Sequence, residues 1–193
     1  MIISIGGKPG SGKSTIAKML ADKLGYTYYY IGGMRRKMAE ERKITLHQLN
    51  ALGETEEWTD KEVDAYQRTL GQREDDFVID GRTSHHFIPH ALKIFVDVTP
   101  RIGAERVFRD IQKKRAHRTD EDKGLTTIQA VEQSHRVRIA SDKLRYHKYY
   151  DIDVYDTKQY DFVLDTSTLN VQESFEKLYD FVSKQGKKER NKS

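Results

Sequence analysis

The chain has 193 residues, enough for one compact domain that buries about 70% of the surface of its unfolded chain. Charged residues make up 33% of it, but 34 basic residues stand against 30 acidic ones, so the net charge of +4 is a slight excess and not a strongly cationic surface. The absence of cysteine excludes a disulfide framework and a thiolate metal site, and no apolar run approaches the ~18 residues of a membrane span. We therefore expect a cytoplasmic monomer that contacts neither membrane nor nucleic acid.

A glycine-rich loop near the start of the chain carries the clearest motif. Residues 7–14 read GKPGSGKS, which matches the spacing Gly, four residues, Gly-Lys-Ser. A β-branched strand over residues 1–6 precedes the loop and an amphipathic helix that ends at Gly25 follows it, as a phosphate-binding loop requires. We expect its N–H groups to surround a polyphosphate, Lys13 to reach the β and γ phosphates, and the Ser14 hydroxyl to ligate Mg²⁺. The predicted nucleotide-binding residues are Gly7, Lys8, Pro9, Gly10, Ser11, Gly12, Lys13, Ser14 and Thr15.

The middle of the chain alternates between strand and helix patterns. Thr45 and Thr59 are expected to cap two helices, and Thr99 followed by Pro100 is typical of the start of a third. Short apolar or aromatic runs between the helices indicate strands, one of which closes on Asp80. Strands are predicted over residues 26–31, 77–80 and 93–98. Helices are predicted over residues 34–43, 45–52, 59–74 and 100–114.

The last third of the chain opens with a polar break over residues 117–124, which has nothing to bury. A long, highly charged helix is expected over residues 126–148, and a fifth strand over residues 160–164. A closing helix follows, whose apolar face comprises Val171, Phe175, Leu178 and Phe181 or Val182. Because five strands alternate with helices, the pattern predicts an α/β fold with a parallel sheet.

Charged residues follow several of the predicted strands. In a doubly wound sheet, ligands bind beyond the carboxyl ends of the strands, so these residues are expected at one edge. Arg36 and Arg82 follow the second and third strands, and a guanidinium fork suits an acceptor phosphate facing the donor in the phosphate loop. Asp80 suits the Mg²⁺ shell, directly or through water. Arg35 and Lys37 are interpreted as ordinary surface charges.

A second group of basic residues lies in and beside the polar break. Arg138 and Arg145 are seven residues apart, two turns on one helical face, so both can point into a closing cleft. Such a set is typical of a mobile lid that neutralises a transferring phosphoryl group. The nearby His85, His86 and His90 lack the spacing of a zinc site, and we interpret the first two as neighbours of the acceptor pocket or as surface residues. The basic set comprises Lys114, Arg115, Arg118, Arg136, Arg138 and Arg145.

These segments together resemble the nucleoside monophosphate kinases of the P-loop group, and among them the short cytidylate kinases of the archaeal type. The resemblance covers nearly the whole chain. Beyond the phosphate loop it rests on Gly-Gly-Met-Arg-Arg at 32–36, Trp-Thr-Asp-Lys-Glu-Val-Asp at 58–64, Val-Ile-Asp-Gly-Arg at 78–82, the Arg-x-x-Ser, Arg-Tyr and Tyr-x-Ile-Asp segments within 138–153, and Leu-Asp-Thr-Ser at 164–167. The order of the Asp-Gly-Arg and Arg-Tyr segments is more specific than the loop alone.

The resemblance implies one P-loop kinase domain with a three-layer α/β/α core around a five-stranded parallel sheet. It implies that Arg36 and Arg82 hold the acceptor phosphate. The implied core comprises residues 1–31, 75–114 and 149–185, the helical acceptor-binding insertion residues 32–74, and the lid residues 115–138. The implied substrate site comprises Arg36, Asp60, Asp80, Gly81 and Arg82, the metal ligands are Ser14 and Asp80, and the groups on the donor and transferred phosphates are Lys13, Arg118, Arg138 and Arg145.

The reaction implied by the resemblance is ATP- and Mg²⁺-dependent phosphoryl transfer to a nucleoside monophosphate, CMP or dCMP, giving the diphosphate and ADP. Two other functions stay open: a P-loop kinase of another small metabolite, which accepts on a hydroxyl group, and a nucleotide-dependent switch or RNA-associated module without turnover. Arg36 and Arg82 favour a phosphate acceptor, and the chain lacks the basic stripe with interleaved aromatics typical of RNA binding.

Three departures from the family pattern bear on the choice of base. Residues 83–86 read TSHH where the family usually has a small apolar stretch, Gly33 replaces an acid, and residues 120–122 add acidic side chains. All three fall near the expected acceptor pocket or lid. They therefore concern the identity of the acceptor more than the presence of kinase activity.

Overall fold

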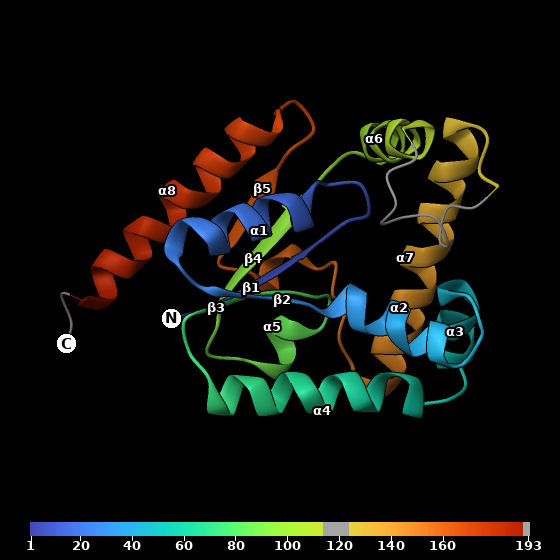
Figure 1. Cartoon of the computed structure of the whole chain (residues 1–193), viewed down its shortest axis with the longest axis horizontal. Coiled ribbons are helices and arrows are strands. Elements are labelled where there is room, and N and C mark those ends of the chain that lie inside the picture. Colours follow the sequence, from blue (N-terminus) through green and yellow to red (C-terminus); the bar gives the residue numbers. More distant parts are fainter. Residues whose placement is uncertain (114–123, 191–193) are drawn as a thin grey trace.

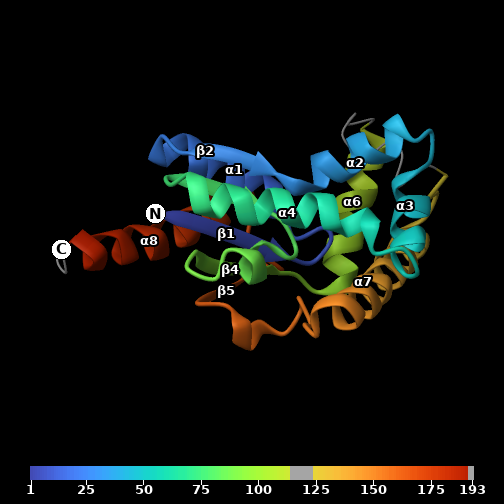
Figure 2. The same ribbon diagram turned by 90° about the horizontal axis from the view of Figure 1, so that it is seen from below.

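The protein was analysed as a computed structural model that describes residues 1–113 and 124–190. Its centre is one sheet of five parallel strands in the order β2-β3-β1-β4-β5. Figure 2 shows β2 and β5 near the two edges of this sheet. The strands are β1 (Ile2–Gly7), β2 (Thr27–Tyr30), β3 (Phe77–Asp80), β4 (Leu92–Asp97) and β5 (Phe162–Asp165). The predicted α/β fold with a five-stranded parallel sheet is confirmed.

The helices in the described part of the chain fall close to their predicted positions. They are α1 (Lys13–Leu24), α2 (Ile31–Glu41), α3 (Leu46–Gly53), α4 (Trp58–Arg73), α5 (Ser84–Phe87), α6 (Pro100–Gln112), α7 (Ile128–Tyr150) and α8 (Val171–Arg190), with a short 3-10 helix η2 (Thr157–Gln159). The short α5 was not predicted, because its four residues carry no helical periodicity. No described helix is both long and apolar enough to cross a membrane.

Helices cover both faces of the sheet (Figure 1), and an apolar cluster lies on each face. On one face, α1 and α8 pack against the inner strands; Leu20 and Leu178 are fully buried there against side chains such as Ile5. On the other face, α2, α3, α4 and the segment after α5 cover Phe77 and Ile79 of β3. This arrangement places every strand's carboxyl end toward the side where α2, α3 and α7 gather. The loops that follow the strands therefore meet at one edge.

The second strand ends earlier than predicted, and the following helix begins sooner. Tyr30 is the N-cap of α2, so Ile31 and the two glycines after it form the first helical turn instead of closing the strand. The ring of Tyr30 packs over this turn: a Cβ atom on Gly33 would lie 2.8 Å from a ring carbon of Tyr30. The glycines thus provide room for an aromatic side chain, and they do not end the strand.

The predicted helix caps fare differently. Thr45 is the N-cap of α3 and forms a capping box with Gln48. The Thr45 Oγ1 accepts from the backbone N–H of Gln48 at 3.1 Å, and the Gln48 Oε1 accepts from the backbone N–H of Thr45 at 2.8 Å. The prediction for Thr59 is wrong. Glu57 is the N-cap of α4, and Thr59 lies in the first turn, where its hydroxyl donates to the carbonyl of Glu56 at 3.0 Å.

Candidate active site

The loop between β1 and α1 is held in a shape that only glycine permits at two positions. Gly10 and Gly12 have φ values of 77° and 81°, in the left-handed region. A Cβ atom on Gly10 would lie 2.3 Å from the carbonyl oxygen of Gly103 in α6, so any side chain there would clash with backbone. Thr166 after β5 donates to the carbonyl of Ser11 at 3.0 Å. These contacts fix the loop at the amino end of α1, where helix N–H groups attract anions.

Lys13 in the first turn of α1 forms an ion pair with Asp80 at the end of β3. The carboxylate of Asp80 is almost fully buried and also accepts from the Tyr28 hydroxyl at 3.1 Å. The same hydroxyl lies 3.5 Å from the backbone carbonyl of Ser14, so Tyr28 links the loop to β3. Burial raises the pKa of Tyr28 to about 12, which keeps its hydroxyl protonated as a donor. Tyr28 therefore helps to organise the site.

A cavity of about 610 Å³ opens above these strand ends. The phosphate loop and α1 line one part of it, and residues of β2, α2, α4, α6, α7 and the turn after β3 line other parts. Among the predicted site residues, those that line it are Gly7, Lys8, Pro9, Gly10, Ser11, Gly12, Lys13, Ser14, Thr15, Arg36, Asp60, Asp80, Gly81, Arg82 and Arg138. Arg115 and Arg118 lie outside the described residues. The cavity is thus bordered by both predicted phosphate-binding groups.

The two arginines predicted to bind an acceptor phosphate are held by different partners. Arg36 donates to the Tyr30 hydroxyl, and its guanidinium lies 5.4 Å from the centre of the Tyr30 ring. Arg82 is 20% exposed; its Nε lies 2.6 Å from Asp142 and 3.3 Å from the hydroxyl of Tyr155. Tyr155 also donates to Asp142 at 2.7 Å. Both guanidiniums are therefore oriented by neighbouring side chains at the edge of the cavity.

A buried ionic network continues from Arg82 into the protein. Asp142 in α7 is 2% exposed and lies 2.9 Å from Arg145, whose other nitrogen lies 3.2 Å from Asp60 of α4. Asp60 in turn pairs with Arg35 of α2. Burial opposes the ionisation of Asp142, but Arg82 and Arg145 outweigh it and keep the pKa of Asp142 below its usual range. The network therefore joins α2, α4, α7 and the turn after β3 through alternating charges.

Two predictions about arginines need revision in view of this network. Arg35 is not a surface charge: it is 7% exposed, lines the cavity and donates to Asn50 at 3.1 Å as well as to Asp60. Lys37, in contrast, lies on the surface beside Glu41 as predicted. Arg145 is 1% exposed and does not line the cavity, because Asp60 and Asp142 take up its guanidinium. Arg138 alone of the predicted α7 pair borders the cavity.

The histidines after β3 contribute to packing. His85 is buried, with one ring nitrogen 3.4 Å from Gln159 and the other 3.3 Å from the Tyr160 hydroxyl. Burial lowers the pKa of His85 to about 4, so the ring is neutral near pH 7. His86 and His90 are exposed. Among the described residues, no cluster of histidine and carboxylate side chains is arranged to bind a metal ion.

Sequence reasoning missed three residues of the site: Asp64, Asp142 and Tyr155. Asp142 lies four residues after Arg138 and three before Arg145, a spacing that places all three on neighbouring turns of one helix and could have suggested an ion pair. Asp64 lies four residues after Asp60 on the same face of α4. Tyr155 had no such signal, because it reaches Arg82 only through tertiary packing.

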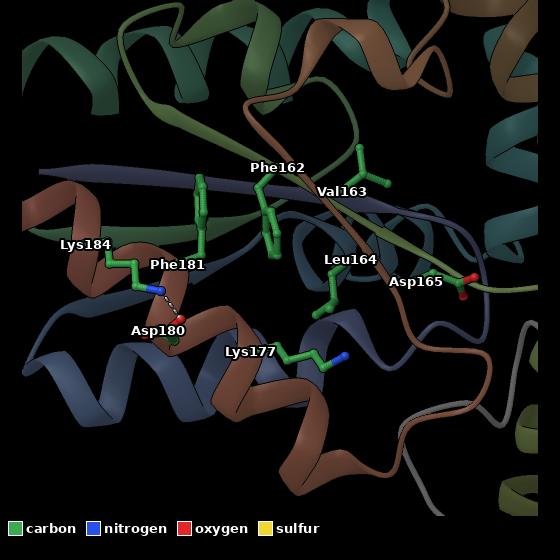
Figure 3. Close-up of a pocket in the computed structure, with 8 residues that line it drawn as sticks. All are labelled: Phe162, Val163, Leu164, Asp165, Lys177, Asp180, Phe181 and Lys184. Carbon is green, nitrogen blue, oxygen red and sulfur yellow. Dashed lines mark hydrogen bonds and ion pairs between the residues drawn. The ribbon is translucent and has the colours of Figure 1, made fainter.

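A second cavity, of about 540 Å³, lies between β5 and α8 (Figure 3). Eight residues from these two elements line it. The rings of Phe162 and Phe181 stack there at 4.3 Å, and Asp180 forms an ion pair with Lys184 at 2.6 Å. This cavity lies where α8 packs against the edge strand β5, and the predicted phosphate-binding residues line the other cavity.

The chain is similar to known proteins in sequence and in fold. Residues 2–168 match the cytidylate kinase-like family. The chain is 34% identical to the cytidylate kinase of Methanocorpusculum labreanum over 176 residues, 91% of this chain and 92% of that protein. It is also 34% identical to the cytidylate kinase of Methanocella arvoryzae over 167 residues, 86% of this chain and 88% of that protein. The structure of shikimate kinase from Bacteroides thetaiotaomicron has a TM-score of 0.63 at 15% identity, covering 95% and 98% of the two chains, and so shares the fold.

Proposed function

The chain belongs to the cytidylate kinase-like family, and we propose that it transfers the γ-phosphoryl group of ATP to a nucleoside monophosphate, CMP or dCMP. The bond between the γ phosphorus and the β-γ bridging oxygen breaks, and a new bond forms between that phosphorus and an oxygen of the acceptor phosphate. ADP and a nucleoside diphosphate result. The observation that carries the proposal is one cavity bordered by both the phosphate loop and the acceptor-side Arg36 and Arg82.

On the donor side, the phosphate loop and the first turn of α1 supply the groups for ATP. Backbone N–H groups at the start of α1 have no intrahelical acceptor and suit phosphate oxygens. Lys13 lies in the phosphate loop, lines the cavity and forms an ion pair with Asp80. It would exchange its carboxylate partner for the β and γ phosphates and so stabilise the charge that moves during transfer.

The Ser14 hydroxyl and the Asp80 carboxylate fit Mg²⁺, since both are oxygen ligands and both residues line the same cavity. The Tyr28 hydroxyl links the Asp80 carboxylate to the backbone carbonyl of Ser14. Held by Ser14 and Asp80, Mg²⁺ would supply positive charge that offsets the negative charge of the ATP phosphates. The Asp80 carboxylate is almost fully buried and forms an ion pair with Lys13. Ser14 and Asp80 thus place a hydroxyl group and a carboxylate in the part of the cavity where the triphosphate is expected to bind.

On the acceptor side, Arg36 and Arg82 would grip the monophosphate, and α2 to α4 would enclose the nucleoside as the acceptor-binding insertion. Arg138, which borders the cavity from α7, would neutralise the transferring group together with Arg118 of the lid. Arg145 would act indirectly, because its side chain is occupied by Asp60 and Asp142. The reaction is then direct transfer between two anions whose repulsion the arginines cancel.

A coupled assay of ADP release with ATP, Mg²⁺ and a panel of nucleoside monophosphates tests the proposal. CMP or dCMP should stimulate ADP release strongly, and free cytidine should not. Arg82→Ala should lower kcat/KM for the acceptor by roughly 100-fold, because a charge-assisted contact to a phosphate is lost. Arg101→Ala is the matched control, since Arg101 lies exposed on α6 and its ion-pair partner among the described residues is Glu105 of the same helix.

Three results would contradict the proposal. Undiminished acceptor kinetics in Arg82→Ala would mean that this arginine does not bind the acceptor. ADP release with cytidine but not with CMP would identify a kinase that phosphorylates a hydroxyl group. Tight ATP binding without stimulation by any monophosphate would instead identify a nucleotide-dependent switch.

A further inference from the structure

Asp64 is a buried carboxylate in the wall of the cavity whose partners are neutral. It is 3% exposed, yet it borders the cavity from the inner face of α4. One oxygen accepts from the Tyr150 hydroxyl, and the other accepts from the side-chain amide of Gln67 at 3.3 Å. In the described part of the chain, Asp64 takes part in no ion pair. Its charge is therefore held by hydrogen bonds alone.

The contrast with Asp60, one turn earlier on the same helix, is informative. Asp60 lies between the guanidiniums of Arg35 and Arg145, which supply charged donors for both of its oxygens. A carboxylate can accept about four hydrogen bonds, and Asp64 accepts two. Asp64 thus keeps acceptor capacity next to an open cavity, whereas Asp60 is part of the structural network.

Unlike Asp80, which pairs with Lys13, Asp64 has no ion-pair partner among the described residues and would repel a facing phosphate. It must face a part of the acceptor that donates hydrogen bonds. Gln67 also donates to the Thr83 hydroxyl at 3.1 Å, so Asp64 is one side chain away from the residue that follows Arg82. Helix α4 lies on the opposite face of the sheet from α1 and its phosphate loop (Figure 1). Asp64 therefore lies beyond the acceptor phosphate, on the nucleoside side.

The surroundings of Asp64 favour a base over a sugar. Val63, its neighbour in α4, and Tyr146 of α7 line the same cavity with apolar and aromatic surface. The ring of Tyr146 stacks on that of Tyr150 with centres 6.2 Å apart, and Tyr150 is the residue that donates to Asp64. A flat heterocycle can pack on such surface while an amino group at its edge reaches the carboxylate.

We infer that Asp64 accepts a hydrogen bond from the exocyclic 4-amino group of the acceptor's cytosine base and thereby distinguishes cytosine from uracil; this inference rests on the proposed function. Cytosine presents N–H donors at its 4-position, and uracil presents a carbonyl oxygen there. Two acceptors facing one another lose the hydrogen bond and repel. A site built to accept from a substrate N–H discriminates strongly against an analogue that lacks it.

The protonation state of Asp64 agrees with this role. Burial is the main reason that the pKa of Asp64 rises to about 6, and the hydrogen bond from Tyr150 limits the rise. The carboxyl group is therefore mostly ionised near pH 7.5, where it acts purely as an acceptor.

The test compares the wild-type protein with Asp64→Asn on four acceptors: CMP, UMP, dCMP and the monophosphate of the pyrimidin-2-one nucleoside, which lacks the 4-amino group. We expect wild-type kcat/KM to fall roughly 10- to 100-fold from CMP to the pyrimidin-2-one nucleotide and at least as far for UMP. Asp64→Asn should lose most of this discrimination, while the ratio of CMP to dCMP stays unchanged. Glu62→Gln, which removes an exposed charge from the same helix, should behave as wild type.

The outcomes separate the inference from the proposed function. A wild-type protein that uses no monophosphate contradicts both. A wild-type protein that phosphorylates CMP and the pyrimidin-2-one nucleotide equally well remains a kinase but overturns the inference, and this result needs no variant to fold. Discrimination that survives intact in Asp64→Asn, or a CMP to dCMP ratio that shifts instead, also overturns it. Unchanged ATP binding by titration confirms that the variant is folded.

Discussion

Arg82 owes its position to two side chains from a distant part of the chain. Asp142 lies 2.6 Å from its Nε, and the Tyr155 hydroxyl lies 3.3 Å from the same atom. The Tyr155 hydroxyl also donates to Asp142, which closes a triangle of three groups. The direction of an arginine that we assign to the acceptor phosphate is thus set by residues of α7 and the loop after it.

Tyr155→Phe tests this positioning role. The change removes the hydroxyl that contacts both Arg82 and Asp142 and leaves the ring, which packs edge-on against Phe95. We expect KM for the monophosphate to rise about 3- to 10-fold with little change in KM for ATP, since one or two hydrogen bonds of about 1 kcal/mol orient the guanidinium. Tyr179→Phe on α8, whose ring stacks on Phe175, is the control. Equal changes in both KM values would indicate a general structural defect instead.

At the level of single residues, sequence reasoning identifies groups that directly follow a strand or belong to a motif. Lys13, Asp80 and Arg82 meet that condition, and all three line the cavity. Asp142 and Tyr155 do not, because only the packing of α7 against the turn after β3 brings them to Arg82. The prediction that Arg35 is a surface charge was wrong, because its ion-pair partner Asp60 lies 25 residues away in the chain and no local pattern links the two.

The inner face of α4 carries two carboxylates one turn apart, and among the described residues only Asp60 forms ion pairs. Asp60 is neutralised by Arg35 and Arg145, while Asp64 relies on Tyr150 and Gln67. Burying an ionised carboxylate without an ion pair costs free energy. The ionised Asp64 therefore lowers the stability of the protein at neutral pH, while it provides a charged hydrogen-bond acceptor in the cavity wall.

This cost should appear in the pH dependence of unfolding. The folded protein holds the Asp64 proton up to a pKa of about 6, against 3.8 in the unfolded chain, so this group's contribution to stability is full below about pH 4 and is lost as the pH rises through 6. Asp64→Asn removes the titration. Between pH 4 and pH 8, the free energy of unfolding of Asp64→Asn should therefore gain roughly 2.5 kcal/mol relative to wild type.

Chemical denaturation at a series of pH values measures this difference, with Glu62→Gln as the control for an exposed carboxylate on the same helix. Several charged or titratable groups near Asp64 influence its pKa. They are Asp60, Arg68, Arg35 and Tyr150. The pH dependence of stability is therefore compared between Asp64→Asn and wild type, because the curve of either protein alone also contains the titration of other groups. Parallel curves for Asp64→Asn and wild type would show that Asp64 does not titrate in this range.

Helix and strand boundaries were predictable where local patterns decide them. The strand over residues 77–80 has the predicted bounds, and the capping box at Thr45 forms. The start of α2 was misplaced because two glycines usually end an element, whereas here they make room for the ring of Tyr30. That ring comes to rest on the glycines only in the folded protein, so no local pattern contains the information.

Across the molecule, the alternation of strands and helices was sufficient to predict a parallel sheet. It did not predict the order of the strands, which depends on tertiary packing. In the order β2-β3-β1-β4-β5, the phosphate loop after β1 lies between the ends of β3 and β4. The buried network of arginines and aspartates joins this edge to α2, α4 and α7. The helices that enclose the cavity are therefore coupled to the residues that we assign to the acceptor phosphate.

The proposed reaction requires one cavity to bind a donor triphosphate and an acceptor monophosphate at the same time. Calorimetric titration with one molecule that carries adenosine and cytidine joined by a chain of phosphates tests it most directly. We predict one such molecule bound per chain, at least 100-fold more tightly than ATP or CMP alone, with ATP and CMP each excluded from the complex, because linking two ligands makes the second contact intramolecular. An affinity no better than that of ATP, with CMP still able to bind, would contradict the account.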